Sequence, residues 1–180
     1  MRVAALIAFV ALTAGWTLEP DPRTSCQLPP VSREPGKVLV YLVRTDAPSV
    51  ETVAASRSVS AAEAEAPLKA ALVRLLSGVT RDERLAGCGS TFRDDAHVLR
   101  SVTLEDGQAT IDFRRGPFLR ELAIVSASSA GTYFGGQIAK TVFQFPSVRS
   151  IRFEFDGNCK AFGDFMQAGV CIVVPRERAG

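Results

Sequence analysis

The sequence predicts an α+β fold, a two-layer sandwich in which a small mixed sheet carries two helices on one face. Three observations support this class. Segments with the period of strands alternate along the chain with two segments of helical period, and Gly, Pro or Asp-Gly stands at the junctions. The order is strand, short strand, helix, hairpin, helix, strand, so that both helices can cover one sheet. With 180 residues, 47% of them hydrophobic, the chain can bury one core.

The first predicted strand is KVLVYLVR, residues 37–44. Its nearly continuous apolar run, rich in β-branched residues, is typical of a strand that is buried on both faces. The more polar segment that follows is expected to add a short strand containing Val53 and Val59.

The first helix is predicted from apolar residues at helical spacing, which are Leu68, Ala71, Leu72, Leu75 and Leu76. Pro67 fits the first turn, where its missing N–H costs nothing, and Gly78 ends the helix. A capping-box pattern, SAAE, also begins at Ser60, but a single helix from there would hold Pro67 in its interior at about 3 kcal/mol. We therefore expect the main helix to start near Ala66. A second box, TRDE from Thr80, predicts a short helical turn.

A β-hairpin is predicted around Asp106-Gly107, a pair that accepts the positive φ angles of a tight turn. The apolar residues that should share one face of this hairpin are Val98, Val102, Leu104, Ala109, Ile111 and Phe113.

The pattern is helical again over residues 119–145, and Pro146 ends it. Its Ser/Gly-rich middle, residues 126–136, predicts a kink or a helix–loop–helix, because Ser and Gly are poor helix formers. The last strand follows, with Ile151, Phe153 and Phe155 on one face and Arg152 and Glu154 on the other.

The ends of the chain predict export. Residues 1–15 have the pattern of a signal peptide or an N-terminal anchor, residues 16–36 that of a Pro-rich tether, and residues 158–180 form an extension after the domain at 37–157. The net charge of +2, with scattered basic residues, does not indicate nucleic acid as a partner. Membrane contact is expected only through an uncleaved N-terminus.

Four cysteines in an exported chain indicate disulfides. Cys159 and Cys171 bracket a short segment and are the natural local pair. Cys26 and Cys88 either form a second bridge or remain free thiols. Without a C-x-x-C, the spacing supports neither redox chemistry nor zinc.

The sequence predicts no catalytic residue, no cofactor and no metal. His97 follows Asp94 and Asp95 but lacks a serine in a nucleophile elbow. Glu154 and Asp156 are the other candidate acid–base pair, on the polar face of the last strand. The glycines do not form a phosphate-binding loop.

A cluster of basic and aromatic residues offers a candidate partner patch, with a solvated turn as the alternative. Its members are Arg114, Arg115, Phe118 and Arg120.

Residues 37–157 resemble the GerMN domain, a family named for the sporulation and germination protein GerM. The resemblance is carried by VLVYLVR, PLKAALVRLLSGVTRDERLAGCGSTF, SVTLEDGQATIDF and GGQIAKTVFQFPSVRSIRFEFDG. The last stretch is the most specific, because it unites Gln137, Thr141, Phe145, Pro146, Val148 and Asp156-Gly157. Val79 stands where the family usually has proline.

The resemblance implies a non-enzymatic extracytoplasmic module that binds another envelope protein or itself, and it supplies no catalytic residues. We expect the interaction to use the exposed sheet face or an edge strand. The alternative is an exported small-ligand-binding protein or hydrolase, with a pocket near the Ser/Gly-rich segment around His97, Tyr133 and Arg115.

Overall fold

The computed structural model describes residues 26, 28–29, 31, 34–44, 51–126 and 128–178. The predicted signal peptide or anchor and most of the predicted tether lie outside these residues. The α+β class is confirmed, since strands and helices alternate along the described chain. One feature differs from the expectation: the strands are divided over two sheets and do not form one.

The first sheet has the strand order β2-β1-β3, and the second has the order β4-β5-β6-β7. Only β5 and β6 pair in parallel; the other neighbours are antiparallel. The strands are β1 (Lys37–Arg44), β2 (Thr52–Ser58), β3 (Cys88–Gly89), β4 (Leu99–Glu105), β5 (Gln108–Phe113), β6 (Ser150–Phe155) and β7 (Val173–Pro175).

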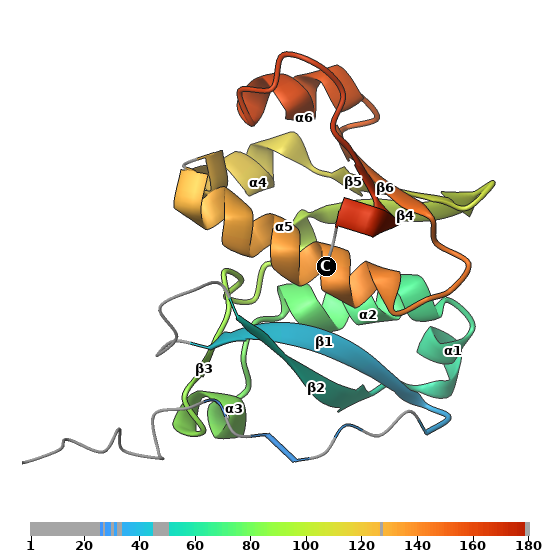
Figure 1. Ribbon diagram of the computed structural model, residues 1–180, viewed down its shortest axis with the longest axis vertical. Helices are drawn as coiled ribbons and strands as arrows, with labels where there is room; N and C mark the ends of the chain where they lie inside the picture. Colours follow the sequence, from blue (N-terminus) through green and yellow to red (C-terminus); the bar gives the residue numbers. More distant parts are fainter. Residues whose placement is uncertain are drawn as a thin grey trace, which may run out of the picture.

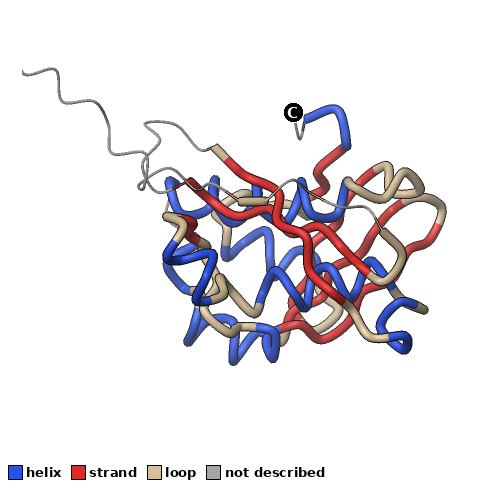
Figure 2. Tube along the Cα trace, turned by 90° about the horizontal axis from the view of Figure 1, so that it is seen from below, coloured by secondary structure: helices blue, strands red, loops and turns tan. Residues whose placement is uncertain are grey.

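Two helices, α2 and α5, pack against each other and against β1, and they lie between the two sheets (Figure 1). The view from below shows helices and strands in one body (Figure 2). The α-helices are α1 (Ala61–Ala64), α2 (Pro67–Leu76), α3 (Arg81–Leu85), α4 (Arg115–Glu121), α5 (Ser128–Phe143) and α6 (Cys159–Phe165). Three short 3-10 helices are η1 (Ala96–Val98), η2 (Ala123–Ser126) and η3 (Arg176–Arg178).

The predicted limits of the first long helix are confirmed. Pro67 is its first residue, and Gly78 follows the C-cap with a φ of 74°. The capping box at Ser60 is present as well, but it opens the separate one-turn helix α1. The box at Thr80 opens α3 as expected. Local capping chemistry therefore sets these boundaries.

The second helical region is broken into α4, η2 and α5, but the break lies before the predicted position, because residues 128–136 of the Ser/Gly-rich segment belong to the continuous helix α5. Gly131 lies where α5 returns over η2, and a Cβ there would stand 2.7 Å from the carbonyl oxygen of Val125. A glycine is thus required for this close approach.

The inner face of the second sheet carries a cluster of phenylalanines. Phe118 of α4 and Phe134 of α5 have ring centroids 5.7 Å apart, and Phe162 of α6 lies 4.9 Å from Phe155 of β6. The rings in this cluster are Phe113, Phe118, Phe134, Phe153, Phe155, Phe162 and Phe165. Three helices are therefore held on one sheet face by interlocking aromatic contacts.

Along the edge of β1 that faces away from β2, the backbone groups form hydrogen bonds with side chains at the C-terminal end of α5. These side chains take the place of a neighbouring strand. The amide of Gln144 accepts from the N–H of Leu39 (3.0 Å) and donates to its carbonyl oxygen (2.7 Å). Thr141 Oγ1 accepts from the N–H of Tyr41 (3.1 Å), and Gln137 donates to the Tyr41 carbonyl oxygen (2.9 Å). Helix spacing of four and three residues places Gln137, Thr141 and Gln144 on one face. We call these three side chains the α5 ladder.

Gln137 is fully buried and also holds the segment after β3. Its Oε1 accepts from the N–H of Thr91 (2.9 Å), and its Nε2 donates to Ser90 Oγ (3.2 Å). Because β3 covers the end of β1 and the α5 ladder covers its middle, the edge of β1 has no place for a further strand. The strands therefore separate into two sheets.

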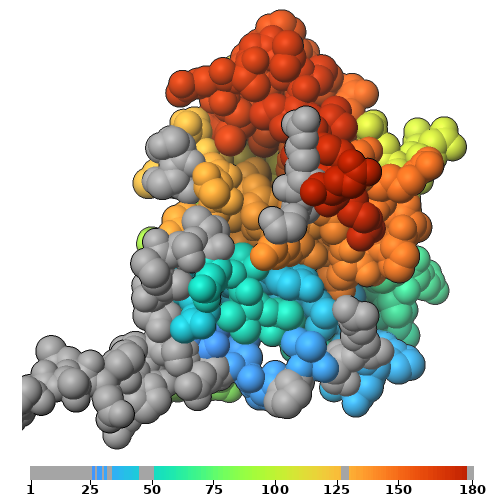
Figure 3. Space-filling model, viewed as in Figure 1, coloured from blue at the N-terminus to red at the C-terminus, as the bar shows by residue number. Residues whose placement is uncertain are grey.

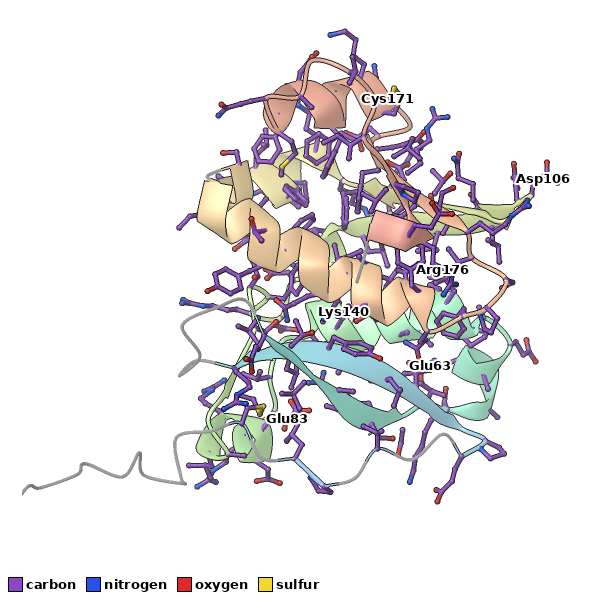
Figure 4. The ribbon with its side chains drawn as sticks, in the orientation of Figure 1. Glu63, Glu83, Asp106, Lys140, Cys171 and Arg176 are labelled. Carbon is purple, nitrogen blue, oxygen red and sulfur yellow. A yellow bond between two sulfur atoms is a disulfide. The ribbon has the colours of Figure 1, made fainter. Side chains whose placement is uncertain are left out.

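The C-terminal extension closes the other edge of the second sheet. Cys159 and Cys171 are joined by a disulfide, with Cα atoms 4.9 Å apart, and β7 pairs with β6. Arg176 then donates to the carbonyl oxygens of Phe143 (2.7 Å) and Phe145 (2.6 Å), at the end of α5 (Figure 4). The red extension forms the top of the molecule (Figure 3).

A second disulfide joins Cys26 to Cys88, with Cα atoms 4.6 Å apart. Leu28 packs against the core beside it. Of the two alternatives for these cysteines, the structure has the bridge, which attaches the segment before the domain to β3.

Replacing Gln137 by Leu should lower the free energy of unfolding by about 1–3 kcal/mol for each buried partner that is left unpaired, here the Tyr41 carbonyl and the Thr91 N–H. Urea denaturation of the oxidised protein measures this loss. Gln108→Leu is the control, because Gln108 makes only one long side-chain bond, of 3.4 Å, to Ser150. Equal stability of the two variants would contradict the role of the α5 ladder.

Peptide mapping of the secreted protein without reduction should recover Cys159 linked to Cys171 and Cys26 linked to Cys88. The measurement is mass spectrometry of the cross-linked peptides, with a reduced sample as control. Free thiols at Cys159 and Cys171 in protein secreted by its own host would refute the local pairing.

Candidate interaction surface

The residues of the enzyme alternative do not form a site. His97 is exposed in η1, and its carbonyl oxygen accepts from Arg114. Tyr133 lies half-buried on α5, and Arg115 is exposed at the start of α4. None of these three residues lines any of the three pockets described in this article. Among the described residues, no group of His, Cys, Asp and Glu is placed to hold a metal ion.

The candidate acid–base carboxylates have structural partners. Glu154 is paired with Arg152 at 2.9 Å, and Asp156 accepts from the backbone N–H of Arg115 at 3.3 Å. Asp95 is buried and accepts from the backbone N–H of Arg93 at 2.7 Å. These contacts stabilise turns and strands, and neither candidate pair, Asp94 with Asp95 or Glu154 with Asp156, lines one of the three pockets together.

The cluster Arg114, Arg115, Phe118 and Arg120 is not one surface patch. Phe118 is fully buried in the aromatic cluster and cannot contact a partner. Arg114 donates to the carbonyl oxygens of His97 and Leu99. The three arginines are all exposed, but the guanidinium group of Arg114 is bonded to the backbone, and Phe118 lies on the side of α4 that faces the sheet.

Strand β4 is an open edge of the second sheet. Asp106 and Gly107 have φ values of 48° and 79°, so the predicted tight turn is confirmed, and Glu105 pairs with Gln108 across it. Along an antiparallel hairpin, hydrogen-bonded residue pairs alternate with non-hydrogen-bonded pairs, beginning with the bonded pair at the turn. The backbone N–H and C=O groups of Val102 and Leu104 therefore point away from β5, toward the outer edge of the sheet. No described strand pairs with that edge. The hairpin projects beyond the helices, with Asp106 at its tip (Figure 4).

An apolar groove of about 240 Å³ runs beside this edge. Val102 and Leu104 lie opposite Ile111 and Ala109 and so share the inner face of the sheet, but the first turn of α2 does not cover them fully. Leu104 is 41% exposed. The β4 groove, as we name it, is lined by Ala66, Pro67, Leu68, Lys69, Val102, Thr103, Leu104, Phe145 and Ser147.

Another edge strand is β2, which carries mainly small and polar residues. The pocket of about 250 Å³ beside it contains the carboxylates of Asp82 and Glu83 and is bounded by Leu28 and Pro29. The β4 groove differs from this pocket in having no carboxylate residue in its lining.

The family model with the description Germane, sporulation and spore germination, matches residues 39–160. This chain belongs to that family. The match agrees with the resemblance to GerMN domains that the sequence shows. The Germane domain includes the α5 ladder and β4, whereas most of α6 and all of β7 lie after the matched residues.

Two solved structures are similar to this Germane domain. The tandem GerMN domains of the sporulation protein GerM from Bacillus subtilis share 18% identity, with a TM-score of 0.51, over 68% of this chain and 39% of theirs. The chain thus spans 39% of the length of that tandem structure. The first GerMN domain of the same protein gives a TM-score of 0.47 at 18% identity, over 68% of this chain and 84% of its own. No curated protein matches the chain. In the described residues, no helix is long and apolar enough to cross a membrane.

Sequence reasoning found the residues of β4 but not the groove beside them. The alternation of Val102 and Leu104 indicated a face that packs on the core. The groove depends on how closely Leu68 and Phe145 approach that face, and no local pattern specifies this distance.

Proposed function

We propose that this chain is an exported, non-enzymatic Germane domain that binds an extended segment of another protein of the bacterial cell envelope. The observation that carries the proposal is that one edge of the second sheet is covered and the other is open. The edge of β6 is covered by β7 and secured by a disulfide and by Arg176, while the edge of β4 is open beside an apolar groove.

Export is supported by the two disulfides, because such bonds persist in oxidising compartments. The apolar run in residues 3–12 also fits secretion. Both observations favour the outside of the cytoplasmic membrane as the place of action.

Binding by strand addition is supported by the chemistry of β4. An added strand would satisfy the outward N–H and C=O groups of Val102 and Leu104. Its alternate side chains would reach the β4 groove, where Leu68 and Phe145 offer apolar contacts. Exposed edges are commonly protected by charged side chains, proline or a bulge. Residues 101–104 of β4 carry neither charge nor proline, and the charged residues Arg100 and Glu105 and the register shift at Leu99/Ser101 lie at the two ends of the strand.

Capture of envelope proteins by the full chain, compared with its Leu104→Lys variant, tests the proposal. Lysine in the β4 groove places a charge against apolar residues and should reduce recovery of the specific partner about tenfold or more. Quantitative mass spectrometry of the captured proteins measures recovery, and cross-linking should map the partner to β4.

Ile124→Lys is the matched control, because Ile124 is 69% exposed on η2 and the exchange is the same. It should leave recovery unchanged. Recovery of background proteins only, together with turnover of a substrate by the wild-type chain, would end the proposal. Equal recovery with both variants would exclude β4 as the binding edge.

A further inference from the structure

A polar pocket of about 550 Å³ lies at the opposite end of α2 from the β4 groove. It forms where the C-terminus of α2, the short helix α3 and the loop after β3 meet. Its lining residues are Ser77, Gly78, Val79, Arg84, Cys88, Gly89, Ser90, Phe92, Arg93 and Asp94. We call it the arginine pocket.

The two arginines of this pocket have no carboxylate partner. Arg84 and Arg93 are exposed, and within the described part of the chain their guanidinium groups make neither an ion pair nor a hydrogen bond. Two nearby carboxylates, those of Glu83 and Asp95, already have other hydrogen-bond partners. Glu83 is held by Arg57 at 2.5 Å, with about a tenth of each side chain exposed, and Asp95 accepts from the Arg93 backbone. Asp94 is the one carboxylate in the lining, so positive charge is in excess.

The walls of the arginine pocket are held in place before any ligand arrives. Cys88 is bridged to Cys26, and the N–H of Asp95 donates to the carbonyl oxygen of Leu76 at 2.7 Å. Arg57 donates to the carbonyl oxygens of Arg74 and of Gly78, the latter at 2.7 Å. A pocket with fixed walls loses little conformational freedom on binding.

One wall leaves no space for a side chain at Gly78. A Cβ there would stand 2.6 Å from the carbonyl oxygen of Phe92, and the φ of 74° favours glycine. Asp94 also has a positive φ, of 78°, which is uncommon for a residue other than glycine. The loop after β3 is thus held tightly against the end of α2.

Unsatisfied backbone donors add to the attraction for an anion. Within the described residues, the N–H groups of Val79 and Asp94 have no hydrogen-bond partner. Guanidinium groups bind carboxylates with paired hydrogen bonds, and backbone N–H groups can complete such a site. The half-buried Val79 supplies an apolar contact beside the charges, which an inorganic anion cannot use.

We infer that the arginine pocket binds a glutamate or aspartate side chain, with an apolar neighbour, from an acidic segment of the partner protein. This inference rests on the proposed function and names the chemistry of the partner. It uses a surface separate from the β4 groove, so the two can fail independently.

The test is a titration of the full oxidised chain, followed by NMR of backbone amides and arginine side chains. The probe is the blocked peptide acetyl-Gly-Glu-Leu-Glu-Gly-amide. Signals from Arg84, Arg93 and Val79 should shift on addition of the peptide, and affinity should fall as salt is raised. The same peptide with glutamine in place of glutamate should bind at least about tenfold more weakly, because it lacks the charge that the arginines recognise.

Two double variants of equal charge separate the pocket from general electrostatics. Arg84→Gln with Arg93→Gln should weaken binding of the glutamate peptide about tenfold or more. Arg115→Gln with Arg120→Gln removes two exposed charges from α4 and should leave affinity within about twofold. Thermal unfolding confirms that each variant is folded.

Equal weakening by both double variants, or equal binding of the two peptides, would overturn the inference. If inorganic phosphate shifts the same signals and binds with equal affinity, the ligand of the arginine pocket is a small anion and not an acidic peptide, and the inference is overturned. The Leu104→Lys variant should retain peptide binding. Suppose that the Leu104→Lys variant no longer captures the envelope partner and that the wild-type chain does not bind the peptide. The proposed function would then be supported, and only the inference about the arginine pocket would be rejected.

Discussion

The hydrogen bonds between the α5 ladder and the edge of β1 are the constraint on which the rest of the fold depends. Backbone groups of a central strand must find partners when they are buried. Here a helix supplies them through Gln137, Thr141 and Gln144. The bidentate contact of Gln144 with Leu39 reproduces the two bonds that a neighbouring strand would make. The polar side chains of Gln137, Thr141 and Gln144 are therefore essential to the packing of α5 on β1.

This arrangement decides where the molecule has free edges. Because side chains from α5 satisfy the hydrogen-bonding edge of β1, the second sheet is separate and lies on the other side of the helices (Figure 1). It consequently has two edges of its own to protect. The extension after the Germane match protects one of them, with β7 and the clamp of Arg176 on the end of α5. The edge of β4 remains open and lies beside apolar side chains.

The elements that sequence analysis predicted are those with local physical causes. Pro67 and Gly78 mark the ends of α2, and Asp106-Gly107 forms the turn between β4 and β5. The Ser/Gly-rich segment, by contrast, lies mostly within α5 and does not divide the helical region. The number of sheets was not predictable in this way, because the partner of β1 is a set of side chains about 100 residues away along the chain. Phe118 shows the same limit. Three arginines, Arg114, Arg115 and Arg120, lie within four residues of it in the sequence, and only the position of α4 on the sheet turns its ring inward.

The bridge between Cys26 and Cys88 has a mechanical consequence. Any tension applied through the residues that precede Cys26 enters the domain at β3, by way of the covalent bond. The load therefore bypasses Lys37, the first residue of β1, and does not peel β1 away from β2. If the protein is held by its N-terminal segment and pulled at another point, the force passes through the disulfide between Cys26 and Cys88, and β1 stays in place.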